Sequence, residues 1–495
     1  MKRIYFSVVF FLLAPFGVEA ATFEFTSNCR QAYNYMLQLN FNSSRNYLAI
    51  EKTANPDNAA IYYIEHYCDF IQAFISEENA DFLKLKNNLD KRISSIEKAE
   101  GSPWTNMATG EMLMQFAVLK LKRKEYLSSG YFIRRSYKMV QDNQVKFPDF
   151  YPNLKSLGFF HAVIGAVPEN YKWLANLAGL EGTISQGSKE LAQLSARIES
   201  DKSLQFITEE VNFIRVFIAT HFEKDYAGAE KLIEKMKKSI PANYPLLTFL
   251  EVNTMLVSGK PNEAQSALNG YRPDKNSYQL FYLNYLSGML KLHRLEMDAS
   301  GDFKVFLSSF KGKSFVKSAW HKLAWISLLK NDTAGYNQNI GKVKMMGDDF
   351  TDEDKQALKE ANSKILPNIF LLRCRLLFDG GNYNAALEEL AGKPSSCYPT
   401  YKDQLEFTYR LARIFDKRGQ TDKAIQYYTA TYSNGMRSEF YFAANAALNI
   451  GTIYENSGDK DKAIQWYKKC LNLRNHEYQN SIDQKAEAGL NRLVH

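Results

Sequence analysis

Histidine and cysteine are the side chains with which this chain of 495 residues could bind a metal ion or form a covalent intermediate, and it has seven histidines and five cysteines. No two histidines stand in a His-Glu-x-x-His pattern, and no acidic cluster completes a ligand set. His66 and Cys68 are two residues apart, which on a helix directs them to different faces. We therefore expect the histidines to be core or surface residues, and we predict no metal, no cofactor and no catalytic site.

The sequence Gly312-Lys313-Ser314 matches the end of a phosphate-binding loop, but the first glycine of that motif would fall at position 307, where this chain has Leu307. No strand pattern precedes it, so we interpret it as a turn between helices. The acidic group Asp352-Glu353-Asp354 stands at the start of a predicted helix, where the helix dipole favours negative charge. The chain is thus predicted not to be an enzyme.

The five cysteines allow two disulfides if the protein folds in an oxidising compartment. Cys29 with Cys68, and Cys374 with Cys397, would each close a helical hairpin, and the odd number leaves at least one thiol unpaired. Spacing alone does not decide connectivity, so bridged and free states of both pairs stay open.

The first 20 residues have the pattern of a secretory signal peptide. Lys2 and Arg3 precede an apolar stretch over residues 4–16, and Val18-Glu19-Ala20 offers small residues for cleavage after Ala20. The stretch is shorter than the roughly 20 residues of a membrane span, and no cysteine follows it directly for a lipid anchor. We expect an exported protein, in a bacterial periplasm or cell envelope because the basic segment is short. A eukaryotic secretory origin is the alternative.

The most apolar later segment, residues 157–180, is interrupted by Pro168, Glu169 and Lys172, and charge is costly at the centre of a membrane. We interpret it as a buried helical hairpin and expect no transmembrane span after signal cleavage. The net charge of +8 is spread along the chain, so it does not indicate nucleic acid as a partner.

The elements that carry these residues are predicted to be helices. The chain has 45% hydrophobic and 14% aromatic residues, only 13 prolines, and no alternating strand pattern of useful length. Its C-terminal third repeats itself at an interval of 39 residues. The matched positions are Ala412, Phe415, Gly419, Ala424 and Tyr428 in one unit and Gly451, Tyr454, Gly458, Ala463 and Tyr467 in the next.

Each matched position has a packing reason. Small residues in both helices of a unit let the helices approach closely, while Gly419 and Gly458 follow the first helix, where the backbone needs a positive φ. These offsets are those of the tetratricopeptide repeat, a helix-turn-helix unit. The chain therefore resembles a tetratricopeptide-repeat protein, which implies an all-α solenoid of stacked hairpins.

The repeat pattern covers only part of the chain. We place tetratricopeptide-like repeats over residues 203–495, clearest at 367–400, 405–438 and 444–477, with an inserted helix at about 351–365. Residues 21–202 form an N-terminal helical region with apolar residues every three or four positions but without the repeat template.

Within that region, a series of short blocks occurs in a fixed order: Glu111-Met112-Leu113, Arg135-Ser136-Tyr137, Gly158-Phe159-Phe160, Pro168 and Gly179-Leu180-Glu181-Gly182. Together they resemble the tetratricopeptide-repeat protein 39 family, which includes the eukaryotic inclusion-body-clearance proteins of the mitochondrial outer membrane region. The resemblance spans residues 107–195. It implies a shared scaffold more than a shared task, because those intracellular proteins lack a signal peptide.

A repeat array of this kind lines its concave face with the first helix of each unit. Arg375, Tyr409, Arg413 and Lys417 fall at groove-facing positions and would form a basic-aromatic strip for an acidic peptide or a free carboxylate. A solvated helix face is the simpler interpretation of the same pattern.

From the signal peptide, the lack of catalytic motifs and the repeat array we predict an exported, non-enzymatic scaffold or adaptor that binds a protein or peptide partner through the concave face. A ligand- or glycan-binding module of the cell envelope is the alternative. It would be favoured by exposed tryptophans at the groove, but four of the five tryptophans are predicted core residues.

Overall fold

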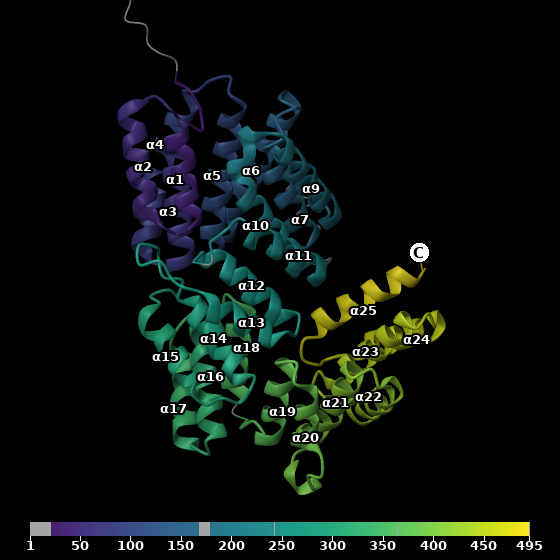
Figure 1. The fold of residues 1–495 in the computed structure, drawn as a ribbon. Coiled ribbons are helices and arrows are strands. Elements are labelled where there is room, and N and C mark those ends of the chain that lie inside the picture. The colour runs from purple at the N-terminus through teal and green to yellow at the C-terminus, as the bar shows by residue number, and fades with distance from the viewer. Residues whose placement is uncertain (1–20, 168–178, 242, 364, 495) are drawn as a thin grey trace, which may run out of the picture.

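The structure is a computed structural model that describes residues 21–167, 179–241, 243–363 and 365–494. In these ranges the chain is helical, and the only extended pairing is an isolated parallel bridge between Thr22 and Asn58. The prediction of an all-α fold is confirmed (Figure 1). The predicted signal peptide, the centre of the predicted hairpin at 157–180, and Trp173 lie outside the described residues.

The N-terminal part of the chain forms antiparallel helical hairpins. Its helices are α1 (Ser27–Leu37), α2 (Phe41–Ala54), α3 (Ala60–Ser76), α4 (Asn79–Glu97), α5 (Pro103–Lys122), α6 (Tyr126–Lys146), α7 (Asn153–Gly165) and α9 (Ile184–Ser200). The main pairs are α1 with α2, α3 with α4, α5 with α6, and α7 with α9. The hairpins lie side by side at the top of Figure 1, so their apolar faces meet in one core.

The middle part continues as shorter helices. They are α10 (Thr208–Ile218), α11 (Tyr226–Lys237), α12 (Pro245–Val257), α13 (Pro261–Gly270), α14 (Tyr282–Leu292), α15 (Ala299–Ser309), α16 (Val316–Leu329), α17 (Thr333–Met345) and α18 (Asp352–Ser363). The helix α18 has no antiparallel partner of its own and packs on both α16 and α17. It begins at Asp352, so the predicted acidic helix start and the predicted inserted helix are both present.

The C-terminal part is a regular array of hairpins closed by one further helix. It comprises α19 (Ile369–Asp379), α20 (Tyr383–Leu390), α21 (Tyr401–Lys417), α22 (Thr421–Gly435), α23 (Phe442–Asn456), α24 (Lys460–Leu471) and α25 (Gln479–Val494). In Figure 1 this array extends sideways from the lower end of the molecule, and α25 lies above α23 and α24 and ends at the C-terminus.

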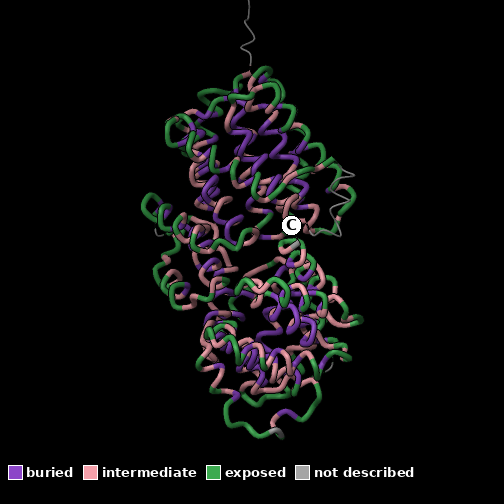
Figure 2. Tube along the Cα trace, turned by 90° about the vertical axis from the view of Figure 1, so that its right-hand side faces the viewer, coloured by how far each residue is buried: buried purple, intermediate pink, exposed green. Residues whose placement is uncertain are grey.

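The buried apolar residues form three main clusters rather than one. The first runs from Phe23 to Leu250, the second centres on α14 to α17, and the third runs from Leu371 to Ala486. Figure 2 shows these buried positions inside both ends of the molecule. The first cluster continues across residue 203, where the repeat pattern starts in the sequence, because α9 packs on α10.

Three hairpin turns of the N-terminal part touch the middle part, and each contains a residue with a left-handed backbone. These residues are Leu39, Glu77 and Lys124, with φ of 57°, 56° and 62°. The Tyr278 N–H donates to the Leu39 carbonyl at 2.8 Å, and Lys124 Nζ lies 2.6 Å from the Asp348 carboxylate. The two parts are therefore joined by polar contacts at the hairpin ends as well as by apolar packing.

The turn at Gly312-Lys313-Ser314 belongs to the same junction. It lies between α15 and α16, which confirms its interpretation as an inter-helix turn. The N–H groups of Lys313 and Ser314 donate to the Glu77 carboxylate at 2.8 and 2.9 Å. Lys122 Nζ lies 2.6 Å from the other oxygen of that carboxylate. The anion held by this turn is thus a side chain of the protein itself.

The predicted packing of the two repeat units is confirmed in detail. Ala424 and Ala463 are fully buried between helices. A Cβ added to Gly451 would come within 2.6 Å of the Tyr467 ring, so only glycine permits this helix crossing. Gly419 and Gly458 have φ of 70° and 82°, the left-handed conformation expected after the first helix.

The cysteines are all free thiols, and neither of the two possible disulfides is formed. Cys29 and Cys68 have separate polar neighbours: Asn58 Nδ2 lies 3.7 Å from the first sulfur, and Ser44 Oγ lies 3.2 Å from the second. Burial raises the pKa of both thiols to about 11. Burial also raises the pKa of the Cys374 thiol, to about 12, so these thiols are inert core residues.

Candidate functional site

The predicted basic-aromatic strip lies on α19 and α21, two neighbouring first helices of the C-terminal array. Lys417 is exposed, Arg413 and Arg375 are half-buried, and Tyr409 is only 5% exposed. The four residues therefore do not form one open surface. Their surroundings differ enough that each has to be assessed separately.

Tyr409 is a core residue of the repeat. Its ring centroid lies 5.5 Å from that of Phe442 and 5.9 Å from that of Tyr441, both at the start of α23. Burial raises the pKa of Tyr409. The helical position was predicted correctly, but the following repeat covers the ring, so Tyr409 supports the strip from beneath and does not face a partner.

Arg375 already has an acidic partner, and that partner comes from the same chain. Its Nη1 lies 3.1 Å from Glu360 Oε1 on α18, and its Nε lies 3.8 Å from Asp379. The guanidinium also lies over the ring of Trp325, 4.8 Å from the centroid. Although burial opposes ionisation of Glu360, Arg375 holds the pKa of that carboxyl well below its ordinary range. Arg375 is therefore engaged by an acidic side chain of α18 in the same chain.

The same helix reaches the end of the array. Lys359 of α18 lies 3.1 Å from the Glu477 carboxylate and 3.9 Å from the centroid of the Tyr478 ring, both just before α25. Consequently α18 contributes side chains both to the start of the C-terminal array and to its last turn. The sequence indicated a helix here, but its role as an internal partner depends on long-range packing that has no local signal.

Arg413 differs from Arg375 because it has no carboxylate partner among the residues that the structure describes. Its guanidinium lies 4.2 Å from the centroid of the Phe378 ring and 6.0 Å from that of Tyr409. No ion pair or hydrogen bond of Arg413 occurs among the described residues. Two rings therefore hold a half-buried cation in place while its N–H donors stay available.

A second cation of this kind was not predicted from the sequence. Lys322 on α16 is 9% exposed, and its Nζ lies 3.8 Å from the centroid of the Trp325 ring. It forms no ion pair with any residue that the structure describes. Burial lowers the pKa of Lys322 to about 8, and the nearby Arg375 guanidinium acts in the same direction. Trp320 and Trp325 indicated an apolar helix, and a buried lysine was therefore not expected there.

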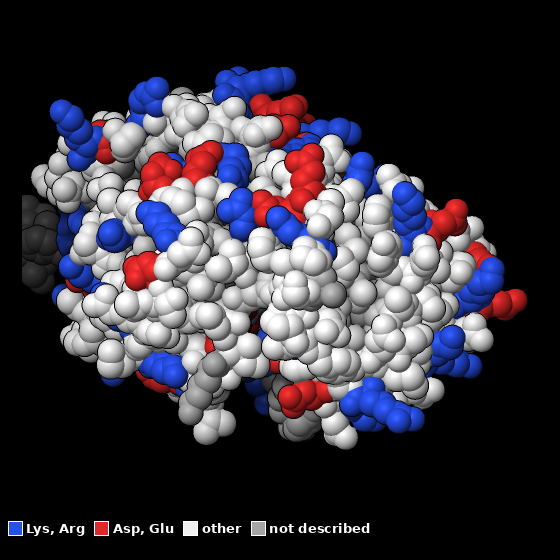
Figure 3. All heavy atoms as spheres, turned by 90° about the horizontal axis from the view of Figure 1, so that it is seen from below, with Lys and Arg blue, Asp and Glu red and all other residues white. Residues whose placement is uncertain are grey.

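What this region can do is bind an anionic group. Arg413 offers a planar fork of donors that suits a carboxylate, and exposed Lys417 stands one helical turn further along α21. The adjacent Arg410 is already paired with Glu406. On the face seen from below in Figure 3, positive and negative side chains are interspersed around a broad uncharged area. That face therefore carries no field of one sign.

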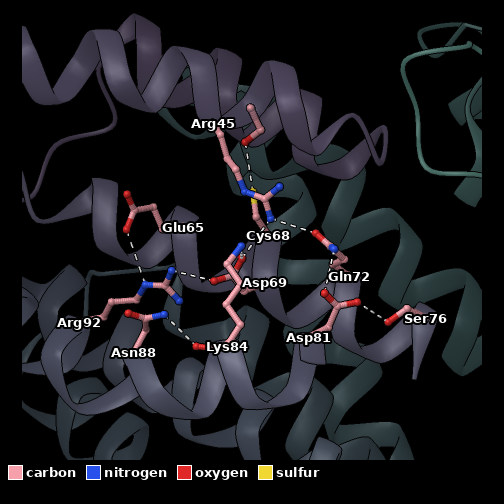
Figure 4. Close-up of polar contacts among 11 residues, drawn as sticks. Arg45, Glu65, Cys68, Asp69, Gln72, Ser76, Asp81, Lys84, Asn88 and Arg92 are labelled. Atoms are coloured by element: carbon pink, nitrogen blue, oxygen red, sulfur yellow. Dashed lines mark hydrogen bonds and ion pairs between the residues drawn. The ribbon is translucent and has the colours of Figure 1, made fainter. Parts of the chain in front are cut away.

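The N-terminal part contains polar clusters of a different kind. Figure 4 shows Asp69 on α3, whose buried carboxylate lies 3.1 Å from Arg45 Nη2, 3.0 Å from Lys84 Nζ and 2.7 Å from Arg92 Nη2. Although burial opposes it, Arg92 lowers the pKa of this carboxyl below its ordinary value. The cluster joins α2, α3 and α4, so its role is to hold three helices together.

A deeper cluster joins α5, α7 and α10. Lys155 is buried, and its Nζ lies 2.8 Å from Glu210 and 3.1 Å from Glu111. The hydroxyls of Tyr63 and Ser156 donate to Glu111, and those of Tyr33 and Tyr67 donate to Glu210. Every member of this network has a partner, which is typical of a structural core and not of a ligand site.

The described residues contain no group of three or more histidine, cysteine or acidic side chains placed to hold a metal ion. Among the same residues, no helix combines the length and the apolar character needed to cross a membrane.

Comparison with known proteins identifies the C-terminal hairpins. Residues 408–433, in α21 and α22, match the tetratricopeptide repeat, and so do residues 444–477, which cover α23 and α24. No curated protein matches the chain. The protein therefore contains tetratricopeptide repeats, and Arg413 and Lys417 lie in the first helix of one of them.

Proposed function

We propose that this protein is an exported, non-enzymatic scaffold that binds a protein partner at the inner face of its tetratricopeptide array. Such arrays present extended concave surfaces to protein ligands, and the pattern of the first 20 residues supports export. The observation that carries the proposal is Arg413, a half-buried guanidinium held over Phe378 and Tyr409 without an acidic partner among the described residues.

The partner segment is proposed to be acidic or to end in a free carboxylate. Arg375 on α19 is engaged by Glu360, so the proposed contact is made by Arg413 and Lys417 on α21. A carboxylate that accepts from Arg413 would replace water around a cation already held by two rings, so little side-chain entropy would be lost. The pairing of Arg375 with α18 serves as an internal example of the same chemistry.

The glycan-binding alternative receives less support. Stacking on a sugar needs an exposed aromatic face, whereas Trp325 and Trp466 are buried in the apolar clusters. Trp320 is half-buried, and Lys342 Nζ lies 3.9 Å from its ring centroid.

The proposal is tested by crosslinking in the native envelope, with a photoreactive amino acid at position 417. The expected result is one dominant protein adduct. Replacing Arg413→Glu in the same protein should abolish the adduct while leaving the unfolding midpoint close to that of the parent.

The control is Lys460→Glu with Lys468→Glu, two exposed lysines on the second helix α24. This variant changes the net charge more than Arg413→Glu does, yet it should keep the adduct. An adduct that survives Arg413→Glu at full yield would show that α21 is not the contact, and a control that also loses it would point to net charge instead.

A further inference from the structure

The outer ridge of α6 carries a line of exposed residues at helical spacing. Successive residues of a helix are rotated by about 100°, so positions 127, 131, 134, 138 and 145 share one side. Leu127 is 95% exposed, Tyr131 62% and Val145 84%. The ridge, which consists of Leu127, Tyr131, Arg134, Lys138 and Val145, lies opposite Ser136 and Val140, which are buried against α5.

Within the described residues, the ridge cations Arg134 and Lys138, and Arg135 beside them, have no partners, unlike the cations just before α6. Arg134, Arg135 and Lys138 are exposed and form no ion pair or hydrogen bond within the part of the chain that the structure describes. By contrast, the basic residues at the end of α5 and in the following turn are paired; they are Lys120, Lys122, Arg123 and Lys124. The paired cations help to hold the fold together, whereas those of the ridge face solvent.

The shape and chemistry of the ridge suit a planar anionic surface. Leu127 and Val145 are 18 residues apart, roughly 27 Å along the helix axis, and the basic residues lie between them. An interfacial helix places apolar side chains below the headgroups and cations beside the phosphates, and the exposed side chains of this ridge offer both.

We propose that the ridge of α6 docks the protein on a membrane surface rich in anionic phospholipid. A nucleic acid would engage the cations but offers no apolar layer for Leu127 and Val145. An acidic protein would need a groove or a complementary face, and a single convex helix provides neither. In Figure 1, α6 lies in the N-terminal stack and α21 lies near the other end of the molecule. Membrane docking would therefore leave the repeat array accessible, and it does not depend on the proposed partner.

The experiment is flotation of the protein lacking residues 1–20 with vesicles of phosphatidylcholine, with and without phosphatidylglycerol. The expected result is binding to the anionic vesicles alone, weakened by added salt. Arg134→Glu with Lys138→Glu should lower the partition coefficient on the order of tenfold or more. Leu127→Ser with Tyr131→Ser should lower it too, which separates apolar insertion from charge alone.

The matched control is Lys231→Glu with Lys238→Glu, two exposed lysines at α11 that give the same change in net charge. It should bind within about twofold of the parent at low salt, since attraction to anionic lipid falls off within a Debye length. The proposal is overturned if the folded parent does not bind anionic vesicles, or if the α6 variants and the control lose binding equally. Binding of single-stranded RNA or poly-glutamate in place of vesicles would also overturn it.

Discussion

The N-terminal hairpins and the C-terminal repeats are both stacks of antiparallel helices, but different interactions hold them together. In the C-terminal array, alanines and glycines let helices touch, and aromatic rings fill the space between units. In the N-terminal stack, buried carboxylates at Asp69, Glu111 and Glu210 are each surrounded by cations or hydroxyls from other helices. The same hairpin architecture is thus stabilised mainly by close packing of small and aromatic residues in the C-terminal array, and by buried ion pairs and hydrogen bonds as well in the N-terminal stack.

This difference determines how each region should respond to substitution. A buried ion pair contributes little net stability when intact, yet removing one partner leaves an uncompensated charge that costs several kcal/mol. Replacing a small residue at a helix crossing by a larger one should cost less stability, because neighbouring side chains can shift by a few tenths of an ångström. We therefore expect substitutions in the N-terminal stack to lower the free energy of unfolding more than substitutions at the repeat crossings.

The largest effect is expected for Lys155→Met. Without the ammonium, Glu111 and Glu210 face each other's charge in the core, and the free energy of unfolding should fall by about 3–5 kcal/mol. Urea unfolding with hydrogen exchange would measure the loss and locate it in α5, α7 and α10. Lys189→Met, at an exposed position on α9, is the control. Adding Glu111→Gln and Glu210→Gln to Lys155→Met should recover part of the stability; no recovery would mean that packing and not charge is responsible.

A smaller loss is expected when the repeat crossings are overfilled. Ala424→Leu or Ala463→Leu places three extra carbons in a fully buried contact, which should cost about 1–3 kcal/mol. Ala488→Leu adds the same carbons at an exposed site on α25 and should be nearly neutral. If both buried variants unfold at the same urea concentration as the parent, the crossings are not the tight contacts described above.

The two regions also differ in how far the sequence predicts them. The repeat pattern predicted local features, such as the left-handed turns at Gly419 and Gly458, because each of them depends on a few neighbouring residues. It located Arg413 and Lys417 on the correct helix, yet it did not predict that Glu360 would engage Arg375, since that contact depends on where α18 packs. The resemblance of residues 107–195 to the tetratricopeptide-repeat protein 39 family stays a prediction.

The ion-pair networks of the N-terminal stack could not be predicted from the sequence, for the same physical reason. Lys155 and Glu210 are 55 positions apart, and no periodicity links them. Lys155 and Glu111 lie on helices that the spacing of apolar residues predicts correctly. That spacing does not predict that their charges are buried. A charged residue inside an otherwise apolar helix, as at Lys155 and Lys322, is the one signal that could have indicated these positions.

The redox state provides a test that does not depend on stability. All five cysteines are thiols in the structure, so protein unfolded in denaturant directly after extraction should contain five titratable thiols. Cys29 and Cys68 belong to the N-terminal stack, and Cys374 and Cys470 to the C-terminal array, so neither region is expected to be crosslinked. Three thiols or fewer would mean that a bridge forms in the native compartment.

The smallest expected effect is the part of the pH dependence that His66 contributes in the N-terminal stack. Burial, together with the nearby Arg92 guanidinium, lowers the pKa of His66 to about 3, and Asp69 only partly opposes this. In the unfolded chain the imidazole regains its ordinary pKa of about 6.5 and binds a proton below it. The unfolded state then binds more protons than the folded state between pH 6.5 and 3, so stability should fall as the pH decreases through this window. At pH 5 the loss of stability from this residue should be about 1–2 kcal/mol relative to pH 7.

His66→Leu should remove that part of the pH dependence of stability. His476→Leu, in the half-buried loop before α25, should leave the pH dependence of the N-terminal helices unchanged. Hydrogen exchange at pH 5 and 7, corrected for intrinsic rates, resolves the two regions, and an equal slope in the parent and His66→Leu would show that His66 is not the titrating group.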